Sequence, residues 1–154
     1  MERSILSKLL GKTKIAFLQS SNQTDWTIYY TRKVSFFLQF LDFIPTVKDS
    51  KGRLRNPSEL KTLNFSTQHQ RNVVLSALCS STFYWYYIIN SDCRNLNKRE
   101  VTHFNIPEIS HSYSECFADI VENLMDDFKA NSTLKTVTYR YKGNITVQYF
   151  NFRL

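Results

Sequence analysis

Two clusters of basic side chains carry the clearest chemistry in this 154-residue sequence, because lysine and arginine bind phosphates and arginine pairs with guanine edges. One cluster lies in the polar stretch 45–58, where Pro45, Gly52 and Pro57 indicate an exposed loop or hairpin tip. The other lies at a tight turn before a helix start, a place that favours anions. With two cations at a strand end, the candidate phosphate- and base-binding residues are Arg32, Lys33, Lys48, Lys51, Arg53, Arg55, Arg94, Asn95, Lys98 and Arg99.

Within the first cluster, Arg53 or Arg55 is expected to reach a guanine in the major groove. Phosphate steering by the same loop is the alternative, and the sequence does not separate the two. Arg32 and Lys33, at the strand end, are expected to meet backbone phosphates.

The second cluster also has a structural interpretation. Asp92 could pair with Arg94 or Arg99, and Asn97 could cap the helix that follows. A phosphate site and a structural role both remain open for this turn.

The distribution of charge favours a polyanionic partner. The formal net charge is +7, and residues 1–71 hold 12 Lys/Arg against 5 Asp/Glu, whereas residues 72–154 hold 8 of each. The surplus therefore lies in the first half. Such asymmetry suggests a surface that faces nucleic acid, the commonest polyanion, although a solvated basic face that binds nothing is the alternative.

Signatures of catalysis are missing from the sequence. Methyl transfer to an adenine amino group uses an Asn/Asp-Pro-Pro-Tyr/Phe loop, and no two prolines here are adjacent. Gly11, Gly52 and Gly143 are isolated, so the sequence has neither the glycine-rich turn of an S-adenosylmethionine site nor a phosphate-binding loop. We therefore expect no catalytic residue and no cofactor.

A small nuclease is a further alternative. Asp49 and Glu59-x-Lys61 loosely fit an Asp…Glu-x-Lys metal site, but so short a motif often occurs by chance. Solvated loop charges beside a strand are the simpler interpretation.

The cysteines and the apolar runs bear on location. Cys79, Cys93 and Cys116 show neither CxxC spacing nor histidines at ligand-like spacing, so we expect free thiols in a reducing cytosol and no metal site. The longest strongly apolar run, 83–89, is far shorter than the roughly 20 residues of a membrane span, and no signal peptide is apparent. The expected location is cytoplasmic, away from membranes.

Local patterns predict the elements that must position the basic residues. Alternating apolar side chains predict strands within 26–43 and at 60–65. The capping pattern Thr67-x-x-Gln70 predicts a helix through Cys79. The aromatic run 83–89 could be a second helix or a buried strand, because periodicity does not separate them.

Two more helix starts are indicated by Asn97-x-x-Glu100 and Ser112-x-x-Glu115. The later helix has an apolar stripe and an acidic face, and the acidic face should point away from phosphates or pack on a partner. Alternation around Lys142-Gly143-Asn144 predicts a hairpin within 136–152.

These elements predict an α+β fold in which a mixed or antiparallel sheet packs against helices near 68–89 and 114–130, with a C-terminal β-hairpin. We expect a single domain, 1–154. Its parts are an N-terminal helix near 2–10 with its linker (1–20), a recognition core (26–112), and a helix with the terminal hairpin (113–154).

One resemblance is more specific. Residues 75–107 read LSALCSSTFYWYYIINSDCRNLNKREVTHFNIP, and Ile28-Tyr29-Tyr30-Thr31-Arg32 lies upstream. These stretches resemble the specificity region of type IIG restriction–modification enzymes and related adenine-specific DNA methyltransferases. Tyr139-Arg140-Tyr141-Lys142 and Tyr149-Phe150 resemble its last hairpin, so the likeness covers most of 26–150. It extends more weakly to the specificity subunits of type I systems.

Two departures from that pattern stand out. Lys33-Val34-Ser35 replaces the usual Gly-Gly after the Tyr-Tyr-Arg strand, and Cys79 replaces an asparagine. The turn after the strand is therefore expected to differ from the family's.

The resemblance implies a non-catalytic target-recognition domain that binds double-stranded DNA. A methyltransferase catalytic domain, in the same chain or a separate one, would then flip an adenine. It also implies an excerpt of a longer bacterial protein or a stand-alone specificity fragment. The competing interpretation is a protein–protein interaction domain that docks through its aromatic strands and uses its basic charge for solubility.

Overall fold

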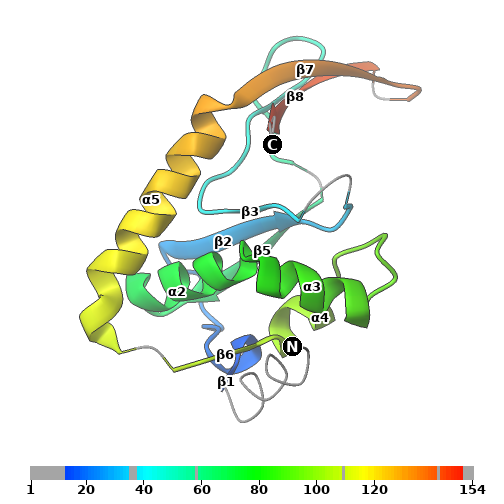
Figure 1. Cartoon of the computed structure of the whole chain (residues 1–154). Coiled ribbons are helices and arrows are strands. Elements are labelled where there is room, and N and C mark those ends of the chain that lie inside the picture. Colours follow the sequence, from blue (N-terminus) through cyan, green and yellow to red (C-terminus); the bar gives the residue numbers. More distant parts are fainter. Residues whose placement is uncertain (1–12, 35–37, 58, 109, 142, 151–154) are drawn as a thin grey trace.

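The predicted strands and helices occur in the expected order, and further short strands occur at 13–14 and 47–48, in a computed structural model that describes residues 13–34, 38–57, 59–108, 110–141 and 143–150 (Figure 1). The N-terminal helix expected near 2–10 lies outside the described residues. The strands are β1 (Thr13–Lys14), β2 (Trp26–Thr31), β3 (Phe40–Leu41), β4 (Val47–Lys48), β5 (Leu60–Phe65), β6 (Asn105–Ile106), β7 (Ser132–Tyr139) and β8 (Gly143–Phe150). The helices are α2 (Gln68–Leu78), α3 (Ser81–Asn90), α4 (Lys98–His103) and α5 (Ser114–Ala130), with 3-10 turns η1 (Ile15–Phe17) and η2 (His111–Tyr113).

The described strands form three separate antiparallel sheets. β2 lies between β3 and β5, β8 lies between β4 and β7, and β1 pairs with β6. The α+β class, the antiparallel pairing and the C-terminal hairpin predicted from the sequence are confirmed. The early and late strands do not share one sheet, except that β4 pairs with β8 through Val47 and Val147.

The main core lies between the β3–β2–β5 sheet and helices α2, α3 and α4 (Figure 1). We call this sheet, together with these three helices, the body. The Thr67 side chain accepts a hydrogen bond from the Gln70 amide at 3.2 Å, which confirms the predicted cap of α2. The Ser80 hydroxyl accepts from the Phe83 amide at 3.3 Å and starts a new helix. The aromatic run is therefore helical, and it buries Phe83 and Tyr87.

The predicted helix start at Asn97 is confirmed without its side-chain cap, whereas the start predicted at Ser112 is wrong by two residues. α4 begins after Asn97, but the Asn97 side chain makes no capping hydrogen bond. α5 begins at Ser114, without a side-chain cap, because an extra 3-10 turn precedes it. The side chain of Ser110 caps that turn by accepting from the Ser112 amide at 3.3 Å, so Ser112 lies within the turn and not at the start of α5.

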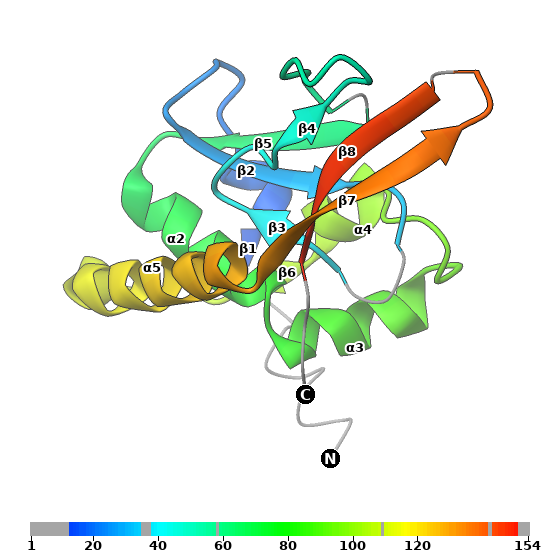
Figure 2. The ribbon, with the colours of Figure 1, turned by 90° about the horizontal axis from the view of Figure 1, so that it is seen from above.

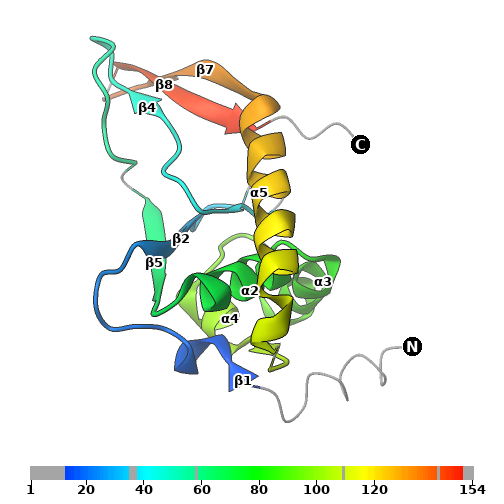
Figure 3. The same ribbon diagram turned by 90° about the vertical axis from the view of Figure 1, so that its left-hand side faces the viewer.

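α5 connects the body to the β4–β8–β7 sheet, which we call the distal sheet (Figure 3). One face of α5 buries Val121, Met125 and Phe128, as its apolar stripe predicts. The Phe150 ring lies 6.1 Å from the Phe128 ring and 6.1 Å from the Phe43 ring, between centroids, which anchors the end of β8. Seen from above, β7 and β8 cross over the body (Figure 2). Within the described part of the chain, no helix has the length and apolarity to cross a membrane.

Candidate nucleic-acid interface

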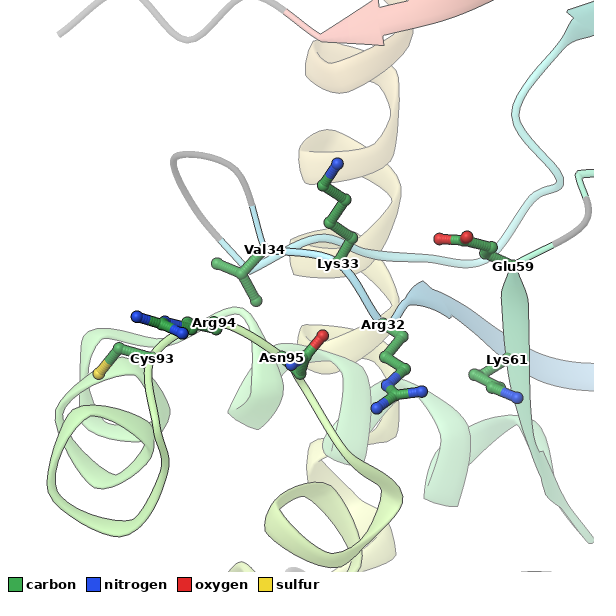
Figure 4. Close-up of a pocket in the computed structure, with 8 residues that line it drawn as sticks. All are labelled: Arg32, Lys33, Val34, Glu59, Lys61, Cys93, Arg94 and Asn95. Atoms are coloured by element: carbon green, nitrogen blue, oxygen red, sulfur yellow. The ribbon is translucent and has the colours of Figure 1, made fainter. Parts of the chain in front are cut away.

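A hollow of about 690 Å³ lies where β2 ends beside the turn that joins α3 to α4 (Figure 4). Four of the eight residues that line it are cations, and they come from three segments of the chain. We call this hollow the basic pocket. Its lining residues are Arg32, Lys33, Val34, Glu59, Lys61, Cys93, Arg94 and Asn95.

Backbone hydrogen bonds bring two of the sequence clusters together at this pocket. Lys33 and Asn95 form an antiparallel bridge. The Leu96 amide donates to the Arg32 carbonyl at 2.7 Å, and Leu96 itself is buried. The sequence placed the strand-end cations and the turn cations in separate groups, whereas the structure joins them at one site.

The turn between α3 and α4 is shaped by Asp92. One carboxylate oxygen of Asp92 accepts from the Arg94 amide at 3.0 Å and from the Asn95 amide at 3.1 Å. These backbone hydrogen bonds, that from Arg94 first, lower the pKa of Asp92. Cys93, which lies between Asp92 and Arg94, has a backbone φ of 56°, in the left-handed region. The expected ion pair between the side chains of Asp92 and Arg94 or Arg99 is therefore wrong, because the carboxylate binds the backbone instead.

The four cations of the basic pocket are not neutralised by carboxylates of the described residues. Within the described ranges, none of Arg32, Lys33, Lys61 and Arg94 lies within 4.0 Å of a carboxylate, and all four are exposed. Arg32, directly after β2, and Lys61, on β5, extend in the same direction, whereas Lys33 points the opposite way, toward the distal sheet (Figure 4). Arg32 and Lys61 therefore present their charges on the same side of the basic pocket.

Two predicted site residues, Lys98 and Arg99, lie outside the basic pocket, and so does the buried Arg71. Arg99 pairs with Glu100 at 3.3 Å, and Lys98 is exposed at the start of α4. Arg71 is buried and pairs with Asp42 at 2.7 Å, so it joins α2 to the segment after β3 and adds nothing to the surface charge.

The loop after β4 is a tight hairpin tip, as predicted. The Asp49 amide donates to the Arg53 carbonyl at 2.9 Å, and Gly52 adopts φ 76°. The Asp49 carboxylate accepts from the Lys51 and Arg53 amides, each at 2.9 Å, and binds the Arg53 guanidinium at 3.0 Å. The backbone hydrogen bond from Arg53 is the largest cause that lowers the pKa of Asp49.

The same contacts bear on the nuclease alternative. Asp49 uses its carboxylate within its own hairpin, which fits the loop-charge interpretation. Glu59 and Lys61 line the basic pocket. Among the described residues, no three histidine, cysteine or acidic side chains are grouped so that they could hold a metal ion.

A second hollow, of about 370 Å³, separates the body from the distal sheet. It shares Lys33 and Glu59 with the basic pocket, so the two hollows adjoin. Arg55 also lines it, and Arg55 has no carboxylate partner within 4.0 Å among the residues described. Val47 and Tyr139 contribute apolar surface from the distal sheet. The two adjoining hollows and the β4 loop, which we call the basic surface, therefore carry cations from both parts of the molecule, with Glu59 as the acidic residue that both hollows share.

The distal sheet adds cations that the sequence analysis missed. Lys48 lies opposite Thr146, so the β4 loop and the terminal hairpin belong to one structural unit. Asp49 is the only acidic residue in the described parts of this unit. The second half of the sequence holds equal numbers of basic and acidic residues, so its net charge gave no indication of basic residues gathered on this sheet. The alternation of basic and aromatic residues at 139–142 is the sequence signal that could have indicated them. Of the exposed or partly exposed cations of the unit, Lys48, Lys51, Arg53 and Arg55 are predicted site residues, and Lys135 and Arg140 are the additional ones.

Negative charge gathers at the other end of the molecule. α5 lies at the left of Figure 1, opposite the loop that joins α3 to α4 at the right. The acidic side chains on its outer surface are exposed, as its sequence predicts. They are Glu115, Asp119, Glu122, Asp126 and Asp127.

Comparison with protein-family models, with curated proteins and with solved structures gives no match for this chain. What can be said of its function therefore comes from the arrangement of its own residues.

Proposed function

We propose that this protein recognises double-stranded DNA as the target-recognition module of a restriction–modification DNA methyltransferase. In this proposal it works in the cytoplasm, carries no catalytic residue and presents DNA to a catalytic domain in the same chain or a separate one. The sequence resemblance and the basic surface support it. The observation that carries it is the set of unpaired cations around the basic pocket, at the end of the molecule opposite the acidic face of α5.

Phosphate contacts supply most of the affinity in this proposal. A cation that replaces the counterions condensed on DNA gains free energy from their release, provided that no carboxylate already neutralises it. Arg32, Lys61 and Arg94 meet that condition among the described residues. The acidic outer face of α5 would repel phosphates, which orients the duplex toward the basic pocket.

Choice of sequence is assigned to the β4 loop. Loops and hairpin tips of this size enter the major groove, where arginine reads guanine with two donors. Arg55 lies on this loop and lines the second hollow, within the basic surface. Phosphates held at the basic pocket would fix the register in which Arg55 meets the bases.

The salt dependence of duplex binding tests the proposal. If about four phosphates are neutralised, the slope of log affinity against log salt concentration should be about −3 to −4. Arg32→Ala combined with Lys61→Ala should reduce the steepness by about 2. Fluorescence anisotropy with a labelled duplex, measured between about 50 and 200 mM salt, gives both values.

A matched control separates a local site from net charge. Lys14→Ala combined with Lys129→Ala removes the same charge, but from β1 and α5, outside the basic pocket. The control should bind DNA nearly as the unaltered protein does. An equal loss in both double variants, or a protein indifferent to DNA, would contradict the proposal.

A second candidate, docking to a partner protein, has one specific observation in its favour. The outer face of α3 exposes Tyr84, Ile88 and Ile89, which are 47%, 46% and 58% accessible. Exposed apolar residues in a group are typical of protein contacts. Indifference to duplex DNA at low salt would favour this interaction domain over DNA recognition.

A further inference from the structure

We infer that the tip of the β7–β8 hairpin is a base-stacking element, in which the Tyr141 ring stacks on a DNA base that is unpaired or weakly paired. This inference rests on the proposed DNA recognition and adds a binding element to it. It concerns a part of the chain where the sequence analysis placed no site residue.

Tyr141 is unusual in its exposure. Its side chain is 89% accessible, the highest value among the exposed large hydrophobic residues of the described chain. Tyr139 and Gly143 form the last pair of the hairpin, and Gly143 adopts φ 67°, which turns the chain sharply there. Tyr141 therefore lies in the turn between β7 and β8, two strands that project away from the body (Figure 1), and it is not part of the core cluster.

The charged residues near the tip of the β7–β8 hairpin are basic, which favours a polyanion as the partner of the tip. The Arg140 guanidinium carbon lies 5.6 Å from the centroid of the Tyr141 ring. The Lys135 ammonium lies 3.5 Å from the centroid of the Tyr149 ring on the same hairpin. Asp49, the only acid of the described distal sheet and its loop, is already bound to Arg53. Cations next to an aromatic ring are the combination that holds a nucleic-acid backbone while a base stacks.

The hairpin is held rigid by contacts between its strands. The hydroxyls of Thr136 and Thr146 lie 3.1 Å apart, and the Thr138 hydroxyl donates to the Asn144 side-chain oxygen at 2.8 Å. These bonds pair neighbouring side chains on one face, close to the tip. A ring carried on such a ribbon loses little conformational freedom when it inserts, so more of the stacking energy appears as affinity.

The ligand that this element fits is a duplex with a disturbed base pair. Every base offers a π-face, so stacking does not select among sequences. Inserting an aromatic wedge into a perfect duplex requires a base step to be unstacked, and that cost falls where a base is already unpaired or mismatched. The tip should therefore prefer a duplex that contains a base without its partner.

Two duplexes of the same sequence test the inference, one fully paired and one in which a 2-aminopurine faces an abasic site. The unaltered protein should bind the disturbed duplex about 5- to 50-fold more tightly and change its 2-aminopurine emission. Tyr141→Ala should bind both duplexes equally, whereas Tyr141→Trp should retain the preference. Tyr113→Ala is the matched control, because Tyr113 is also exposed, at 59%, but lies beside α5.

The outcomes separate this inference from the proposed function. If the protein binds both duplexes with a steep salt dependence but shows no preference, or if Tyr141→Ala keeps the preference, the stacking role is wrong and DNA recognition still stands. A preference that Tyr141→Trp does not keep also overturns it, since stacking needs only a flat ring. If the unaltered protein binds neither duplex, both proposals fall.

Discussion

Arg53 and Arg55 differ in what their guanidinium groups already bind. The Arg53 Nε and Nη2 atoms each lie 3.0 Å from the same Asp49 carboxylate oxygen. Arg55 is exposed and, within the described residues, has no such partner. Arg53 keeps its outer Nη donors for a base, but its ion pair with Asp49 already fixes its orientation and balances its charge, whereas Arg55 can turn toward a guanine without leaving a partner. Arg55 is the better placed of the two.

We expect Arg55→Ala to weaken binding to the preferred DNA sequence by about 1–3 kcal/mol and to relax the choice of base at one position. Arg53→Ala should have the smaller effect on base choice, because the guanidinium it removes is held by Asp49. Selection of bound duplexes from a randomised pool, followed by sequencing, measures both effects.

The two variants remove one charge each from the same loop, so each serves as the control for the other. The opposite ranking, with base choice relaxed only by Arg53→Ala, would show that Arg53 and not Arg55 contacts the base, and would contradict this assignment.

The types of these residues could be predicted from the sequence, but their partners could not. Arginine and lysine in a polar stretch with Gly52 indicate an exposed basic loop, and this is correct. Whether a given cation is free depends on contacts made after folding. Arg71 illustrates this, because its partner Asp42 lies 29 positions away and meets it only when α2 packs on the sheet.

At the scale of elements, the turn between α3 and α4 shows how one carboxylate can hold a binding surface. Asp92 accepts two backbone amide hydrogen bonds and thereby fixes the positions of Arg94 and Asn95. Those hydrogen bonds favour the charged carboxylate, which is why its pKa is lowered in the folded protein.

A lowered pKa makes the stability of the turn depend on pH. The folded-state pKa lies below the ordinary value of 3.8, so the charged carboxylate stabilises the fold above pH 3.8, and this contribution is lost as the pH falls through the lowered pKa. Asp92→Asn keeps an acceptor but does not titrate. We expect the protein to melt at a higher temperature than Asp92→Asn at neutral pH, and the difference to shrink in acid.

Thermal unfolding followed by circular dichroism from about pH 7 to about pH 2.5 measures this difference. Because the two proteins share every other carboxyl group, the comparison isolates Asp92. A difference that stays constant across this range would mean that the carboxylate charge does not stabilise the turn.

The elements themselves were predictable wherever their signal is local. The cap at Thr67 and the terminal hairpin are read directly from neighbouring residues. The pairing of β4 could not be read in this way. Val47–Lys48 is too short to show alternation, and the hydrogen bond from the Thr46 amide to the Gln148 side chain joins positions 102 apart. Only the folded chain brings these residues together.

For the whole molecule, the separation of charge follows the fold and not the two halves of the sequence. Lys135 and Arg140 belong to the neutral second half but lie on the distal sheet with the basic loop. The acidic face of α5 forms the opposite pole. The sequence therefore indicates the sign of the net charge, whereas the location of the basic surface depends on tertiary packing.

Hydrogen exchange should reveal that surface as a footprint. When duplex DNA is added, we expect slower amide exchange at 31–34, 59–61, 91–96 and the tips of the distal sheet, because these segments line the basic surface. The segment 115–127 on α5 should exchange as before. Mass spectrometry of peptic fragments measures both, and protection concentrated on α5 would contradict this orientation of the duplex.

The pairing of β4 with β8 also has a consequence for how the protein is made. Val47 emerges from the ribosome long before its partner Val147, and until then the strand has nothing to pair with. The Gln148 amide donates to the Thr46 carbonyl at 2.8 Å, which closes the sheet over the intervening chain. Such distant contacts form late, because a large loop must first be closed. The β4 loop therefore acquires its final orientation only after β8 has been synthesised and has docked on β4.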